Sequence, residues 1–140
     1  WGAEAEITAN MFHAAGFDWV ANGVADYVRS TITSVGPTPR IPPLRLLGGL
    51  ELQSHHFDLR GEVEWVDKQT RVAANETPTD GFTLVNASAT WRPFGNNSNI
   101  SLIASANNIF DVDARRAASF TKDFAPLAGR DFRVTARVSF

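Results

Sequence analysis

Polar and apolar residues alternate along most of this chain. The final stretch, "DFRVTARVSF", places apolar residues at the even positions 132–140 and charged or hydroxyl residues at the odd positions 131–139. A period of two is typical of a β-strand whose faces meet different surroundings. Six further segments show it, at residues 1–11, 17–27, 44–53, 57–65, 85–92 and 100–107. The pattern predicts an all-β chain of about seven strands, and no segment shows the helical period of about 3.6 residues.

The connectors between these segments alternate in length. Residues 13–16, 55–56 and 95–99 form short connectors, whereas residues 34–43, 69–80 and 111–129 form long ones. Hairpin loops usually contain about 2–5 residues, so three long loops at every second connection are a distinctive arrangement. Connectors that alternate between short and long predict an antiparallel meander with all its long loops at one end.

The apolar face combines small residues in the strand middles with aromatic rings near the strand ends. The rings expected at the short-connector end are Phe17, Trp19, Phe57, Trp91, Phe94 and Phe140, and those expected at the long-loop end are Tyr27, Trp65, Phe82 and Phe110. Two aromatic belts that flank a smooth apolar band are typical of outer-membrane β-barrels. A soluble core would instead place its large rings centrally, where they bury the most area.

The opposite face carries charges of both signs inside the strands. These residues are Glu4, Glu6, Asp26, Arg45, Glu51, Arg60, Glu62, Glu64, Arg133 and Arg137. Opposite charges on neighbouring strands are expected to pair across a water-filled lumen. A soluble β-sandwich with one solvated face is the alternative, and the aromatic belts favour the lipid-facing interpretation over it.

Composition excludes several classes of function. The 13 basic and 15 acidic residues give no basic stripe of the kind that binds nucleic acid, so no nucleic-acid partner is expected. Cysteine is absent, which leaves no thiol nucleophile or zinc ribbon. We find no spacing of nucleophile and base and no phosphate loop, and therefore expect no enzymatic activity. The chain begins within a strand and without a signal peptide, so we expect it to be a piece of a longer protein.

Several segments together resemble a known family. "RIPPLRL", "NETPTDGFTLVNAS", "ASANNIFD" and "SFTKDFAPLAGRDFRVTARVSF" are similar to the C-terminal barrel strands of TonB-dependent outer-membrane receptors. The resemblance implies that the meander is part of a roughly 22-stranded transmembrane β-barrel. Residues 1–140 would then be the C-terminal part of the barrel domain, with the plug and the earlier strands outside this chain.

The resemblance also implies a function. Such a protein is a receptor and transporter in the bacterial cell outer membrane for energy-dependent uptake of a scarce ligand, such as a metal ion, metal chelate or siderophore. The implied partners are outer-membrane lipid, the protein's own plug domain, the TonB energy-transducing complex and the barrel-assembly machinery. No cofactor is expected. A small porin-like outer-membrane barrel and a soluble β-sandwich ligand-binding module are the alternatives.

The end of the chain resembles the strand that the barrel-assembly machinery recognises. In that resemblance the apolar positions Phe132, Val134, Val138 and Phe140 form the assembly signal. The last loop is similar to that of zinc-uptake receptors, in which a histidine stands where this chain has Ala117. Zinc capture through that position is therefore not expected.

Ligand capture is expected on the long loops. The candidate ligand-binding residues are Glu76, Asp80, Asp111, Asp113, Arg115, Arg116, Lys122 and Asp123. His55 and His56 suggest a metal site, because histidine is a common metal ligand. They occupy a two-residue connector, however, and His13 opens another. We expect all three to be solvated turn residues, and we assign no metal ligands.

Overall fold

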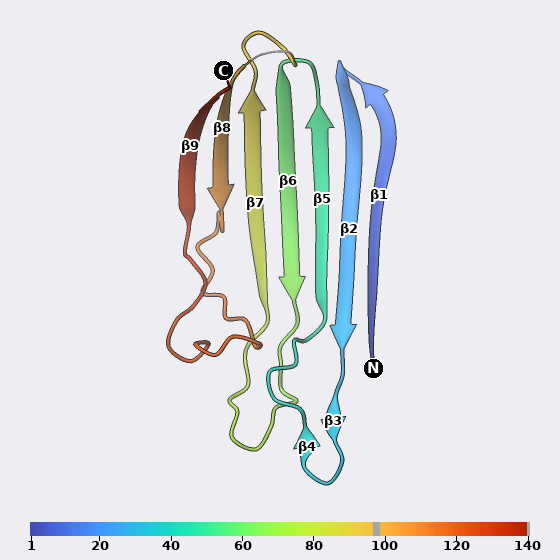
Figure 1. The fold of residues 1–140 in the computed structure, drawn as a ribbon, viewed down its shortest axis with the longest axis vertical. Helices are drawn as coiled ribbons and strands as arrows, with labels where there is room; N and C mark the ends of the chain where they lie inside the picture. Colours follow the sequence, from blue (N-terminus) through green and yellow to red (C-terminus); the bar gives the residue numbers. More distant parts are fainter. Residues whose placement is uncertain (97–98, 140) are drawn as a thin grey trace.

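The computed structural model describes residues 1–96 and 99–139, and these residues form an all-β structure (Figure 1). Seven strands form one sheet in the order β1-β2-β5-β6-β7-β8-β9. Their bounds are β1 (Gly2–Ala14), β2 (Phe17–Val28), β5 (Arg45–Gln53), β6 (Phe57–Val66), β7 (Phe82–Trp91), β8 (Ile100–Asn107) and β9 (Asp131–Val138). Every neighbouring pair is antiparallel, which confirms the predicted meander. In the described part of the chain, no helix is long and apolar enough to cross a bilayer.

The connections follow the predicted short and long alternation. Figure 1 shows the long loops gathered at one end of the sheet and the short turns at the other. Strand β1 continues to Ala14, so its turn is shorter than expected and consists of Ala15 and Gly16, with φ values of 54° and 80°. Positive φ at both central residues is the geometry of a tight hairpin turn, and glycine adopts it without steric cost. The first long loop contains an unpredicted two-stranded sheet, β3 (Thr31–Ile32) with β4 (Gly36–Pro37).

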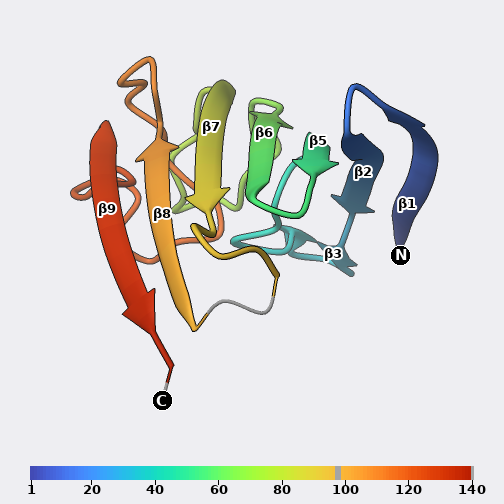
Figure 2. The ribbon, with the colours of Figure 1, turned by 90° about the horizontal axis from the view of Figure 1, so that it is seen from above.

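The register separates the sheet into two chemically different faces. Leu50, Gly61, Ala87, Ala106 and Phe132 lie opposite one another across five strands on what we call the apolar face. This face is open, and the Phe132 side chain is 69% exposed. Seen from above, the strands form a single layer (Figure 2). Among the described residues no second sheet covers the apolar face, which a soluble sandwich would require.

The other face, which we call the polar face, carries the predicted charge pairs. Arg60 lies between two carboxylates, with its Nη1 3.3 Å from Glu51 Oε2 and its Nη2 2.8 Å from Glu62 Oε2. Gly49 leaves room for this arrangement, because a Cβ there would lie 3.1 Å from Arg60 Nη2 and 2.5 Å from Asn22 Oδ1. Cross-strand charge pairing, expected from the alternation, is confirmed.

The aromatic belts differ from the prediction at Phe82. This residue pairs with Val66 on the polar face and is buried beneath the last long loop, so the prediction that it belongs to the long-loop belt is wrong. Strand β7 begins at Phe82, three residues before the predicted segment 85–92, and its even-numbered residues lie on the polar face. At the other end a register shift between Asn10 and Phe12 brings Phe12 opposite Trp19, where the two rings stack at 5.4 Å.

Candidate ligand-binding site at the long-loop end

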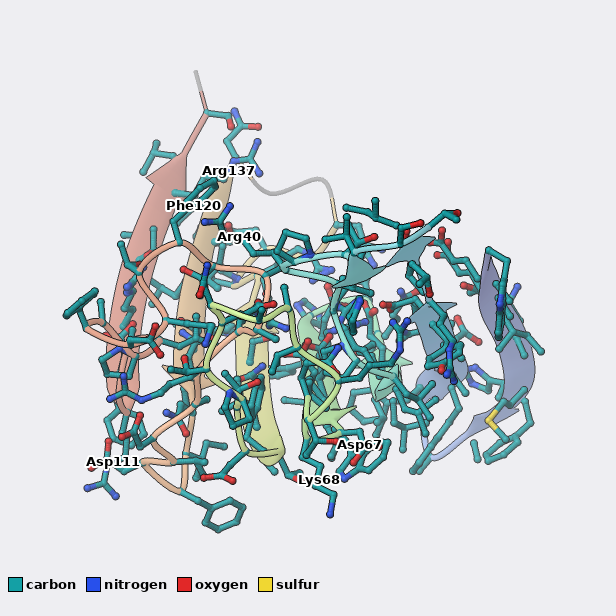
Figure 3. The ribbon with its side chains drawn as sticks, turned by 90° about the horizontal axis from the view of Figure 1, so that it is seen from below. Arg40, Asp67, Lys68, Asp111, Phe120 and Arg137 are labelled. Atoms are coloured by element: carbon teal, nitrogen blue, oxygen red, sulfur yellow. The ribbon has the colours of Figure 1, made fainter. Side chains whose placement is uncertain are left out.

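Three loops meet at one end of the sheet and form the candidate site. They are residues 29–44 between β2 and β5, residues 67–81 between β6 and β7, and residues 108–130 between β8 and β9. Figure 3 shows this end with its side chains. Hydrogen bonds, ion pairs and apolar contacts connect the three loops to one another and to the polar face. The three loops therefore form one connected surface, held together by these contacts.

The last loop is attached to the sheet by a bidentate ion pair. Arg116 Nη1 and Nη2 donate to Glu64 Oε1 and Oε2 at 2.9 and 2.8 Å. Arg45 Nε also donates to Glu64, at 2.6 Å, and Arg45 Nη1 donates to Asp26 at 3.0 Å. Glu64 is only 5% exposed, and a buried carboxylate needs such partners to remain charged. The sequence predicted Glu64 on the polar face, but its pairing with a loop arginine 52 positions away was not predicted.

Apolar contacts lie beside this ion pair. Val66, Phe82 and Leu84 form a small buried cluster with Ala114 of the last loop. The guanidinium of Arg116 also lies 5.6 Å from the centre of the Phe82 ring. The last loop covers this cluster, so the part of the polar face next to the long loops is buried there, whereas we expected it to face a wet lumen.

Asn108 determines how the last loop leaves β8. Its side-chain nitrogen donates to the carbonyls of Val112 and Ala128, at 2.9 and 3.2 Å, and its Oδ1 accepts from the Val112 N–H at 2.9 Å. Asn108 is 3% exposed and has a positive φ of 48°. Asparagine tolerates this conformation better than most residues, which explains its use at this sharp bend.

Lys122 connects the last loop to the loop before it. It is 5% exposed, and its Nζ donates to both the carbonyl and the Oγ1 of Thr77 and lies 3.3 Å from Asp123 Oδ1. The Thr77 hydroxyl donates to Asp123, and this hydrogen bond holds the pKa of the Asp123 carboxyl below its ordinary value. Arg115 Nη1 donates to the Lys122 carbonyl at 2.7 Å.

Arg40 of the first loop contacts residues of both other loops. Its guanidinium carbon lies 3.5 Å from the centre of the Phe120 ring, and Figure 3 shows the two side chains next to each other. The Arg40 N–H donates to Glu76 Oε1 at 3.0 Å, and Glu76 Oε2 accepts from the Ala73 N–H at 3.3 Å. Glu76 thus connects the first two loops.

A pocket of about 510 Å³ opens between the loops. Its apolar lining residues include Ile32, Val35, Pro37 and Pro39. Polar or aromatic surface comes from the Arg40–Phe120 pair, Glu76, Thr77, Lys122 and Asp123. Small-molecule sites typically measure about 300–1,000 Å³ and combine apolar walls with a few polar groups. The pocket has the size and composition of such a site.

The structure places the predicted ligand-binding residues in different settings. Glu76, Lys122 and Asp123 line the pocket, whereas Arg116 binds Glu64 beneath the loop. Asp113 Oδ1 lies 3.4 Å from Arg115 Nε, and Asp111 Oδ1 accepts from the Arg130 N–H at 2.8 Å, away from the Arg40–Phe120 pair in Figure 3. Asp80 is exposed on the second loop. Sequence reasoning missed Arg40 and Phe120 as pocket residues. The proline-flanked arginine of "TPRIPP" was the available signal.

The predicted assembly residues lie on β9, and the histidines lie at the short turns. Phe132, Val134 and Val138 share the apolar face, and Phe140 lies outside the described residues. His13 Nδ1 lies 2.7 Å from Asp18 Oδ1, and the His55 and His56 rings meet edge to face at 4.9 Å. In residues 1–96 and 99–139, no group of three His, Cys, Asp or Glu side chains is arranged to hold a metal ion.

Comparison with known proteins gives one family and a set of similar structures. The family described as "TonB dependent receptor-like, beta-barrel" matches residues 1–109. A solved structure described as "Copper transporter OprC" is similar with a TM-score of 0.82 and 22% sequence identity, over 99% of this chain and 23% of that chain. This likeness shows the fold alone, and the chain spans about a quarter of the transporter's length, at 23%. Among curated proteins, none matches the chain.

Proposed function

The chain belongs to the TonB-dependent receptor-like β-barrel family, and from this premise we propose that residues 1–140 form the C-terminal part of the barrel of an active importer. The family is one of bacterial outer-membrane receptors and transporters, not of enzymes. The observation that carries the proposal is the family match over residues 1–109, together with a single-layer sheet whose apolar face is open. A lipid-facing wall requires such a face.

We propose a metal ion, a metal chelate or a siderophore as the imported ligand. The similar structure is described as a copper transporter, which makes copper the first metal to test. The candidate pocket supports ligand capture at the long-loop end, which corresponds to the extracellular side in outer-membrane barrels.

The proposed partners follow from the same membership. The family implies a plug domain inside the barrel and an interaction with TonB. The apolar face would contact outer-membrane lipid. Phe132, Val134, Val138 and Phe140 would form the strand that the barrel-assembly machinery recognises.

Uptake in the intact bacterium tests the proposal. We expect deletion of the gene to reduce uptake of radiolabelled copper, iron or zinc, supplied as ions and as chelates, under metal limitation. Deletion of TonB should reduce the same uptake to the same extent, because import is expected to need the energy-transducing complex. A small porin-like barrel would give passive uptake that persists without TonB, and that result would contradict active import.

A further inference from the structure

The pocket between the loops contains one arginine whose charged group is unused. Within residues 1–96 and 99–139, the Arg40 guanidinium makes no hydrogen bond or ion pair, and its central carbon lies 3.5 Å from the centre of the Phe120 ring. The other charged side chains of the pocket are occupied. Glu76 accepts two backbone N–H groups, and Lys122 and Asp123 are bound to Thr77. Arg40 is therefore the charge that this pocket offers to a ligand.

The backbone holds Arg40 in an unusual conformation. Its φ is 57°, in the left-handed region that residues with a Cβ seldom adopt. The hydrogen bond from the Arg40 N–H to Glu76 Oε1, at 3.0 Å, supports that conformation from the neighbouring loop. Residues held in sparsely populated conformations concentrate at functional sites, where the surroundings position them in advance. The guanidinium also stacks over the Phe120 ring, which is 79% exposed, as planar cations do on aromatic faces.

The pocket suits an organic molecule better than a bare metal ion. Its volume of about 510 Å³ exceeds the space that one ion and its ligands require, and its free donor is a cation. A guanidinium presents N–H donors in a planar fork that matches the two oxygens of a carboxylate. Ile32, Val35, Pro37 and Pro39 provide an apolar wall for the remainder of such a molecule.

We propose that this pocket binds an amphipathic organic molecule through a carboxylate that is not coordinated to a metal, in a bidentate contact with Arg40 stacked on Phe120. The assignment deepens the proposed function, on which it rests for the position of the pocket at the extracellular mouth of the barrel. It names the chemical class of the ligand: an organic anion with an apolar body.

Calorimetry on the full-length receptor, purified in detergent, tests the assignment. Salicylate serves as the probe, and salicylamide is a neutral molecule of nearly the same shape. We expect salicylate to bind at micromolar to millimolar concentration and salicylamide to bind at least about tenfold more weakly, because charge-assisted hydrogen bonds are about twice as strong as neutral ones.

Substitutions locate the binding. Arg40→Gln should weaken salicylate binding about tenfold or more, Arg40→Lys should weaken it less, and Phe120→Leu should weaken it without abolishing it. Arg137→Gln is the matched control, since Arg137 lies opposite Ser101 near the short turns and does not line the pocket. Heat-modifiable migration in gels shows whether each variant is folded.

Two results would overturn the assignment. One is equal affinity of the folded wild type and the folded Arg40→Gln variant for salicylate. The other is equal binding, or no binding, of salicylate and salicylamide at millimolar concentration. The uptake experiment is independent of both. Salicylate binding by the purified receptor could depend on Arg40 while uptake by the bacterium is unchanged when TonB is deleted. That pair of results would refute active import and leave the pocket assignment intact.

Discussion

At the scale of single residues, the contact between Arg116 and Glu64 has the clearest consequence. Sequence alone suggested Arg116 as a ligand-binding residue, yet its guanidinium is used on a carboxylate that is 5% exposed. A buried carboxylate that loses one of its partners keeps its desolvation cost. Arg116 therefore stabilises the loop by its pairing with Glu64, whatever contact it makes with a ligand.

We predict that Arg116→Gln loosens the last loop. Glu64 would keep Arg45 as a partner, so the expected loss is about 1–3 kcal/mol of loop stability. Trypsin cleavage at Arg115 and Lys122 in the folded full-length protein should become faster, which mass spectrometry of the fragments measures. Arg130→Gln is the matched control, because within the described residues the Arg130 side chain makes no hydrogen bond or ion pair, and only its backbone N–H is used, in its bond to Asp111. Unchanged cleavage in Arg116→Gln would show that the ion pair does not hold the loop.

At the scale of the elements, the strands could be predicted and the folding of the loops could not. Alternation depends on the two faces of a strand, so it gave the seven strands and their order of connection. A loop carries no such period, and its shape depends on distant partners. The burial of Lys122 against Thr77 and of Ala117 within the last loop shows this, because both positions are typical of solvated loops in the sequence. Phe82 was assigned to the wrong face because the loop that covers it was not predicted.

Ala114 offers a test of the last loop as a folded element. Its side chain is fully buried against Phe82 and Leu84, so Ala114→Asp would place a carboxylate in an apolar cluster. We expect this variant to detach the loop from the sheet, because an unpaired buried charge is strongly unfavourable. Hydrogen exchange should show faster exchange in residues 108–130 and unchanged protection in β6 and β7. Ala118→Asp, on an exposed position of the same loop, is the control, and equal exchange in both variants would contradict the role of the cluster.

At the scale of the whole molecule, the two faces of the sheet require different solvents. The apolar face is open across all seven strands, while the polar face holds ion pairs and the folded loops. In the described residues β1 and β9 are edge strands, and a bilayer does not accept unpaired strand edges. This supports our proposal that the sheet is an arc of a larger closed barrel, as expected for the family to which the chain belongs.

Adjacent positions on β8 separate the lipid and lumen environments most directly. Ala104 lies on the apolar face opposite Val134, and Ser105 lies on the polar face opposite Arg133. Arginine at a lipid-facing position near the bilayer midplane costs about 2–4 kcal/mol, whereas lumen positions are hydrated. Ala104→Arg in the full-length protein should thus lower the free energy of unfolding by about that amount, as measured by urea titration in lipid vesicles. Ser105→Arg should lower the free energy of unfolding by less than about 1 kcal/mol. The opposite order of the two variants would mean that the apolar face is covered by protein, and the membrane orientation of the whole sheet would have to be reversed.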